Sequence, residues 1–203
     1  MAIRERKQRE KETLRREILD AARELFVSEG YENVSMRKIA DRIEYSPTTI
    51  YLYFKDKTEL LREICETTFL KLGYEIEKSQ SAGGNPLEVL RNGMLSYIHF
   101  GLSNPHHYDL VFISPNDKNF NASEFTYENS MGKRAFELLV SSVAKCMSAG
   151  SIRTGDVALT AQTLWACIHG ITSLLITHKG FPFHERRTLI ESVVDTSING
   201  LRR

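Results

Sequence analysis

The chain has 203 residues, of which 41% are hydrophobic and 26% are charged, and its net charge is +1. This composition is that of an ordinary globular protein, and the length allows two small domains. No uninterrupted run approaches the roughly 18 to 20 apolar residues that cross a bilayer, and the N-terminus lacks the apolar stretch of a signal peptide. Three widely spaced cysteines, Cys65, Cys146 and Cys167, argue against a disulfide framework. We therefore expect a cytoplasmic protein.

The N-terminus is basic. Residues 1–16 carry seven lysines and arginines against three glutamates. A basic arm, residues 1–13, ahead of a DNA-reading domain can follow phosphates or enter a minor groove. The alternative is a solvated helix end with mixed i,i+4 ion pairs. The sequence leaves both interpretations open.

An apolar stripe at helical spacing follows this arm and predicts the first helix. It ends at Gly30, a residue typical of helix C-caps. The stripe consists of Leu14, Ile18, Ala21, Ala22, Leu25 and Phe26.

Residues 35–57 predict two short helices joined by a tight turn. Ser35 is an N-cap candidate, and Ser46 followed by Pro47 is a second helix start. In the second helix Ile50 and Phe54 are four residues apart and are expected to face the core. The remaining face carries hydroxyls and phenols, which suit phosphates and base edges. These polar residues are Thr48, Thr49, Tyr51 and Tyr53.

A third helix start follows at once. Asp56 is expected to cap it, and Glu59 completes a pattern that resembles a capping box. Lys57 then lies at a helix N-terminus, where its charge and the free amides can jointly hold a phosphate.

Residues 14–74 resemble the N-terminal domain of the TetR family of transcriptional regulators. The resemblance rests on the segments ILDAARELF, GYENVSMRKIA and SPTTIYLYFKDKTELL. It implies an all-α fold, with a three-helix helix-turn-helix DNA-binding domain followed by a helical bundle for ligand binding and dimerisation. The family usually has glycine in the turn between the second and third helices, whereas Glu44 or Tyr45 stands there in this chain. A non-glycine residue can be held in the left-handed region at some cost, so this departure bears on the turn geometry more than on the fold.

The resemblance also implies which residues meet DNA. Thr48 and Thr49 are expected to choose sequence, Tyr51 and Lys57 to bind phosphate, and Arg37 to reach a base from the preceding helix. The alternative is an exposed polar helix face without a DNA role. The complete predicted set is Ser35, Arg37, Ser46, Pro47, Thr48, Thr49, Tyr51, Tyr53 and Lys57.

The remainder of the chain also reads as helical. The helix that opens at Asp56 is expected to run to about Ile76, before the linker-like stretch SQSAGGNP at residues 79–86. Residues 79–203 then form the predicted C-terminal domain, in which residues 114–122 are expected to be a loop. Helix starts are expected at Asn85, Ser123, Asp156 and about His184.

The last two expected helices carry apolar residues on more than one face. One face can pack within the subunit while another is left for a partner, and identical chains pair most simply about a two-fold axis. The TetR resemblance likewise implies a homodimer in which these helices form a four-helix bundle. Trp165, His169 and Gly170 also resemble the Trp and His-Gly signature of one TetR C-terminal subgroup.

A small-molecule pocket is expected in the C-terminal bundle, because bundles form cavities between helices. TetR-like repressors generally release DNA when such a cavity fills. No candidate is a lysine or arginine, which favours an uncharged or weakly polar ligand. The alternative is ordinary core packing, with Trp165 and His169 as a packed pair. The candidates are Met94, Tyr97, Phe112, Tyr127, Met131, Trp165 and His169.

No catalytic or metal motif is present in the sequence. His106 and His107 are adjacent and diverge on a helix, while Cys167 and His169 are two apart and do not share a face. We expect no enzyme activity, no metal and no cofactor. The predicted function is a DNA-binding repressor released from a palindromic operator by a small molecule, without a membrane role. The alternatives are an all-α ligand-binding protein and a protein–protein adaptor without DNA affinity.

Overall fold

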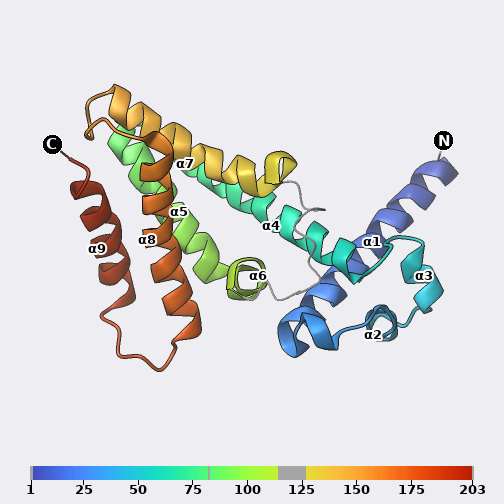
Figure 1. Cartoon of the computed structure of the whole chain (residues 1–203). Coiled ribbons are helices and arrows are strands. Elements are labelled where there is room, and N and C mark those ends of the chain that lie inside the picture. The colour runs from blue at the N-terminus through green and yellow to red at the C-terminus, as the bar shows by residue number, and fades with distance from the viewer. Residues whose placement is uncertain (1, 82, 114–126, 203) are drawn as a thin grey trace. The chain divides into compact units, whose positions relative to one another are not determined.

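The computed structural model describes residues 2–81, 83–113 and 127–202 (Figure 1). Every regular element in these ranges is a helix, which confirms the all-α prediction. The described helices divide into two units. The first unit holds the residues up to Thr67 and residues 110–113, and the second unit holds residues 68–109 and the residues from Tyr127 onward.

The first unit is a three-helix domain closed by the start of a fourth helix. It contains α1 (Ala2–Glu29), α2 (Met36–Arg42) and α3 (Pro47–Tyr51), followed by the beginning of α4 (Lys57–Gln80). A short 3-10 helix, η1 (Tyr31–Asn33), joins α1 to α2. Each of the four helices contributes a side chain with no exposed surface to one core. These side chains are Ile18, Ile39, Ile50 and Leu60.

The basic N-terminus is part of α1, because that helix already begins at Ala2. Arg6 and Glu10 form an i,i+4 ion pair at 3.3 Å, and the Gln8 side chain donates to Glu12 at 2.8 Å. The helix-end alternative therefore describes the conformation of these residues. Contact of this segment with DNA stays a prediction.

The two predicted serine caps are confirmed. The Ser35 hydroxyl accepts from the Lys38 N–H, and the Ser46 hydroxyl accepts from the Thr49 N–H, both at 3.2 Å. Pro47 occupies the first turn of α3, where a missing N–H costs nothing. Each cap satisfies a backbone donor that would otherwise lack a partner, so local chemistry fixes where α2 and α3 begin.

The turn between α2 and α3 contains a left-handed residue that is not glycine. Glu44 has a φ of 60°, and it is the one non-glycine residue with positive φ in the described part of the chain. At the start of α4 the Asp56 carboxylate accepts from the Glu59 N–H at 2.8 Å, as predicted. The Glu59 side chain reaches back to the Lys55 N–H at 2.6 Å, one residue before the cap.

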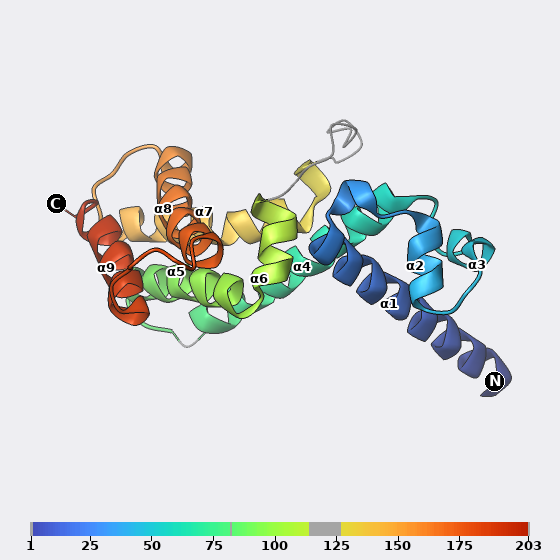
Figure 2. The same cartoon turned by 90° about the horizontal axis from the view of Figure 1, so that it is seen from below.

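The second unit is a bundle built around α5 (Pro86–Ser103), which packs against the neighbouring α7 (Met131–Ser148), α8 (Val157–Thr177) and α9 (Arg186–Asn199). Figure 2 shows these four helices gathered together. The short α6 (Pro105–Tyr108) also contacts α5. The buried centre of the bundle includes Leu90, Met94, Ile98, Leu164 and Val194.

The helix starts in the second unit are partly as predicted. Asn85 and Glu88 form a complete capping box at α5, and Asp156 caps α8 by accepting from the Leu159 N–H at 3.0 Å. The predicted start at Ser123 and the predicted loop at residues 114–122 lie outside the described residues. The helix expected to open at Ser123 instead begins at Met131.

Two other ends differ from prediction. The cap of α7 is Ser130, whose hydroxyl accepts from the Lys133 N–H at 3.1 Å. α8 ends at Thr177, before the expected Gly180. α9 is capped by Glu185, close to the predicted start at about His184.

Within the described residues, α8 is the one helix long and apolar enough to cross a bilayer, with a mean hydropathy of 1.3. Length and composition alone are weak evidence for a membrane span, and α8 packs against α5, α7 and α9. Only 28% of its apolar window is buried. Leu159, Trp165 and Leu174 are exposed. α8 thus has one face in the bundle and also exposes apolar side chains that the chain itself does not cover.

Candidate nucleic-acid interface

α3 presents one exposed face backed by the core of the first unit. Thr48, Tyr51 and Leu52 follow each other at i, i+3 and i+4, so they share that face. Tyr51 is 55% exposed and Leu52 is 77% exposed, whereas Ile50 and Phe54 are 0% and 1% exposed. The buried pair anchors this face.

The structure divides the predicted DNA-contacting residues into two groups. One group is exposed, although the hydroxyls of Ser35 and Ser46 also serve as helix caps: Ser35, Arg37, Ser46, Thr48 and Tyr51. The other group is partly buried within the first unit: Pro47, Thr49, Tyr53 and Lys57. The Thr49 hydroxyl shares a 2.9 Å hydrogen bond with the Ser46 hydroxyl, and Tyr53 packs against the core.

Lys57 connects η1 to the start of α4. Its ammonium group donates to the Tyr31 carbonyl at 3.1 Å and lies 4.1 Å from the centroid of the Tyr31 ring. The Glu32 carboxylate is 4.0 Å away, and the Tyr31 hydroxyl bonds with the Thr58 hydroxyl at 3.0 Å. A phosphate-binding role for Lys57 therefore has to coexist with these contacts.

Sequence reasoning missed an exposed apolar side chain on this surface. Leu52 was not among the predicted contacts, because leucine carries no polar group. Tyr45, in the turn before α3, is also exposed, at 43%. The signal that points to Leu52 is its position four residues after Thr48, on the same helix face.

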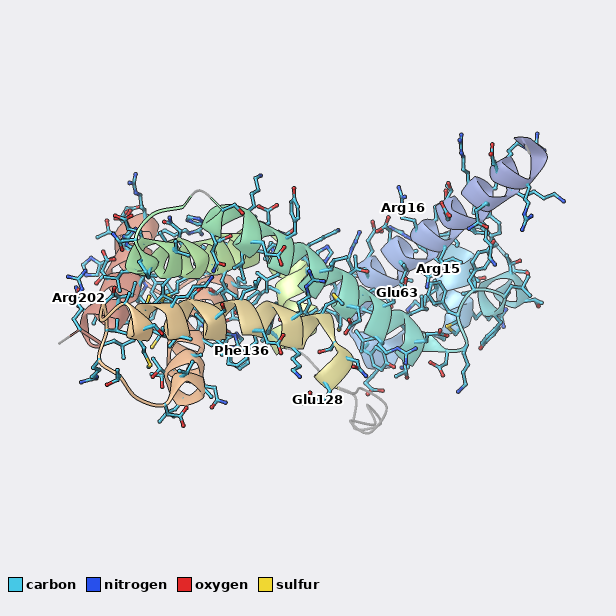
Figure 3. The ribbon with its side chains drawn as sticks, turned by 90° about the horizontal axis from the view of Figure 1, so that it is seen from above. Arg15, Arg16, Glu63, Glu128, Phe136 and Arg202 are labelled. Carbon is cyan, nitrogen blue, oxygen red and sulfur yellow. The ribbon has the colours of Figure 1, made fainter. Side chains whose placement is uncertain are left out.

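Arg15 and Glu63 tie α1 to α4 within the first unit. Both terminal nitrogens of Arg15 donate to the two carboxylate oxygens of Glu63, and Figure 3 shows the two side chains pointing toward one another. The hydrogen bonds to Glu63 raise the pKa of Arg15 above its ordinary value. The Arg15 guanidinium carbon also lies 4.8 Å from the centroid of the Phe54 ring. Arg15 therefore already makes contacts with other residues of the first unit.

In the second unit, three of the predicted ligand-binding residues meet in one hydrogen-bonded cluster. The Trp165 indole N–H donates to the Tyr97 hydroxyl at 3.2 Å, and the hydroxyls of Tyr97 and Tyr108 are 3.0 Å apart. The Tyr108 hydroxyl is 2.6 Å from Nδ1 of His169. The Trp165 and His169 rings lie 5.8 Å apart, as a packed pair. The cluster joins α5, α6 and α8.

The protonation state of this cluster follows from its burial. Burial raises the pKa of Tyr97 to about 12 and also raises that of Tyr108, while it lowers the pKa of His169. At neutral pH the cluster therefore carries no net charge.

The stability of the second unit is expected to fall as pH drops below about 6.5. The unfolded chain takes up a proton on His169 near its ordinary pKa of 6.5, whereas the folded chain does so only at lower pH. His169 therefore stabilises the folded chain above about pH 6.5, and this contribution is lost as the pH falls from 6.5 towards the lower pKa of the folded state. Urea unfolding of the wild type and of His169→Gln, at several pH values from about 7.5 to 5.5, would measure the effect. An identical pH dependence in both proteins would contradict this prediction.

The other predicted ligand-binding residues do not join the cluster. Met94 is 1% exposed in the bundle core, and Met131 is partly buried at the start of α7. Phe112 lies in the π-helical segment η2 (Asp109–Ile113), in the part assigned to the first unit. Tyr127 lies in the short 3-10 helix η3 (Tyr127–Asn129), and its side chain is outside the described set.

A surface groove of about 980 Å³ opens between α4 and α5 in the second unit. Its size is in the range of small-molecule sites. None of the predicted ligand-binding residues borders it. Its walls include Leu70, Tyr74, Asn92, Leu95, Ser96, His99 and Phe100. In the part of the chain that the structure describes, no group of three or more His, Cys, Asp or Glu residues could hold a metal ion.

Two protein-family models match the chain. Residues 18–64 match the model described as bacterial regulatory proteins, tetR family. Residues 90–197 match the model described as the tetracyclin repressor-like C-terminal domain.

Two curated relatives match part of the chain. The chain is 39% identical over 89 residues to the HTH-type transcriptional regulator AcrR of Shigella flexneri, covering 43% of this chain and 41% of AcrR. It is 36% identical over 76 residues to the HTH-type transcriptional repressor KstR of Mycobacterium tuberculosis, covering 37% of this chain and 34% of KstR. The alignments thus span well under half of the length of these relatives.

Solved structures match nearly the whole chain in fold. The transcriptional regulator FadR of Bacillus subtilis, solved in complex with stearoyl-CoA, has a TM-score of 0.77 at 21% identity, covering 92% of this chain and 98% of that one. The regulator PfmR of Thermus thermophilus has a TM-score of 0.70 at 22% identity, covering 92% and 99%. At such identities the likeness is one of fold.

Proposed function

Because the chain belongs to the tetR family of bacterial regulatory proteins, we propose that it is a sequence-specific DNA-binding regulator of transcription that acts as a repressor. The observation that carries the proposal is the exposed face of α3, which is capped by Ser46 and anchored by buried Ile50 and Phe54. α3 enters the major groove, where Thr48 and Thr49 choose sequence and Arg37 reaches a base from α2. Such a regulator works in the cytoplasm and performs no catalytic step.

The proposed regulator is a homodimer built by α8 and α9. The exposed leucines of α8, Leu159 and Leu174, support this part of the proposal, together with the small buried share of this apolar helix. Two copies joined about a two-fold axis form a four-helix bundle from these helices and present two DNA-reading surfaces. The operator is then palindromic, with half-sites about one helical turn, or a multiple of it, apart.

The proposed inducer is a small uncharged or weakly polar molecule bound in the second unit. The neutral cluster of Tyr97, Trp165 and His169 supports this chemistry, since it offers hydrogen bonds without a charge. We also propose that the chain belongs to the Trp and His-Gly subgroup, on the basis of Trp165, His169 and Gly170. α4 begins in the first unit and ends in the second. A ligand that tilts α4 would therefore change the spacing of the two DNA-reading surfaces.

A selection of bound duplexes from a random library tests the function. The expected result is an enriched inverted repeat, because a two-fold dimer reads the same half-site twice. No enrichment at moderate ionic strength would overturn the proposal. Dimers without salt-sensitive DNA affinity would favour a protein–protein adaptor instead.

Lys57→Ala is expected to weaken binding to all duplexes alike and to lower the salt slope of log affinity by about one. The reason is the loss of one phosphate contact. Lys57 also donates to the Tyr31 carbonyl. The thermal unfolding midpoint of Lys57→Ala should therefore be measured together with its affinity for DNA. Tyr51→Phe is a useful companion, since it should also weaken binding uniformly but leave the salt slope unchanged. An unchanged affinity and slope for Lys57→Ala would exclude the phosphate role.

A further inference from the structure

The side chain of Leu52 is the most exposed large hydrophobic one in the described part of the chain, at 77%. A single exposed leucine needs no explanation. Leu52, however, lies beside Tyr51, at 55% exposure, and close in sequence to Tyr45, at 43%. Three large side chains with apolar surface are thus exposed within eight residues, around α3.

Leu52 is the C-cap residue of α3 and keeps helical backbone angles, with a φ of −72° and a ψ of −17°. Its neighbours Ile50 and Phe54 are buried in the core of the first unit, and the Leu52 N–H bonds back to the Thr49 carbonyl at 3.2 Å. Leu52 is also four residues from Thr48, the residue proposed to choose sequence. Whatever meets Thr48 therefore lies within reach of the Leu52 side chain.

We propose that Leu52 is a specificity-determining residue that reads thymine, through contact between its side chain and the C5-methyl group of the base. This inference rests on the proposed function, since it requires α3 in the major groove. Leucine has no hydrogen-bond donor or acceptor in its side chain, so it cannot read the polar pattern of a base edge. The one apolar group that base edges present in the major groove is the methyl group of thymine.

The expected size of the effect follows from the burial of one methyl group. Removing that contact weakens binding by about fourfold per half-site, which corresponds to about 0.8 kcal/mol at about 1.4 kcal/mol per factor of ten. A dimer that makes the contact in both half-sites loses about fifteenfold.

The experiment removes the methyl group from the DNA and the side chain from the protein. Full-length protein is titrated against the duplex obtained by selection and against duplexes in which one thymidine of each half-site is replaced by deoxyuridine. For the wild type, one position should show the loss of about fifteenfold. For Leu52→Ala, the thymine and uracil duplexes at that position should bind equally.

Two further variants separate this contact from general weakening. Tyr51→Phe should bind all duplexes less tightly but keep the preference for thymine over uracil. Phe181→Ala, which removes another exposed apolar side chain, at 60%, in the segment between α8 and α9, should behave as the wild type.

The remaining outcomes overturn the inference. A uracil penalty of equal size in the wild type and in Leu52→Ala assigns the methyl group to another residue. A wild type that is insensitive to uracil at every position excludes methyl readout, while the enriched inverted repeat still supports the proposed function. A protein that selects no duplex at all overturns the proposed function together with this inference.

Discussion

Replacing Phe54 with alanine is expected to lower the free energy of unfolding of the first unit by about 3–5 kcal/mol and to abolish DNA binding. Phe54 is 1% exposed and packs in the same core as Ile18, Ile39 and Ile50. The substitution leaves a cavity among side chains that come from three different helices. Since domains are stable by only about 5–15 kcal/mol, a loss of this size removes much of the folded population.

The measurement is denaturant unfolding followed by a probe in the first unit, together with affinity for the selected duplex. Leu52→Ala is the matched control, because it truncates a side chain two residues away that is 77% exposed. Its stability should stay within about 0.5 kcal/mol of the wild type. If Phe54→Ala were as stable as Leu52→Ala, the role of Phe54 in the core would be refuted.

Gly101→Ala is expected to destabilise the second unit by about 1–3 kcal/mol, although alanine is normally the better residue inside a helix. A Cβ at this position of α5 would lie 2.5 Å from Cγ2 of Thr172 and 2.8 Å from Cδ2 of Tyr108. Both neighbours are fully buried, so neither can move aside freely. The added methyl group must therefore push α5, α6 and α8 apart.

Gly73→Ala provides the control for this prediction. Gly73 lies inside α4, and a Cβ there would meet nothing within 4 Å. This substitution should stabilise the protein by about 0.5–1 kcal/mol, because alanine loses less backbone freedom on folding. Thermal unfolding of the two variants side by side gives shifts of opposite sign. A stabilising shift in both would show that the close approach at Gly101 is absent.

The sequence predicts best what depends on neighbouring residues alone. The caps at Ser35, Ser46, Asn85 and Asp156 were all predicted, because each requires only a short polar side chain next to the free amides of its own helix. The sequence left Glu44 and Tyr45 as alternatives for the usual glycine position of the turn, and the residue with positive φ is Glu44.

The surface of α3 was predicted less well at Tyr53, which was assigned to the polar face. Tyr53 follows the buried Ile50 by three residues, and its N–H bonds to the Ile50 carbonyl at 2.9 Å. It therefore lies next to the buried side of the segment. The Tyr53 ring accordingly packs against the core, while Leu52 takes the exposed place.

Long-range contacts were beyond the reach of local patterns. Tyr108 and His169 are 61 residues apart in sequence, and their hydrogen bond depends on how α6 meets α8. No spacing rule connects them. Trp165 and His169 could be paired in advance only because both lie on one helix face, four residues apart.

The border between the two units falls between Thr67 and Thr68, within the uninterrupted α4. A fragment truncated at Thr67 would end on a helical turn whose last carbonyls lack N–H donors. A fragment begun at Thr68 would start with backbone N–H groups that lack carbonyl acceptors. Neither half can be excised cleanly at its own border. Chimaeras that exchange one half with another regulator would therefore have to transplant α4 whole, from Lys57 to Gln80.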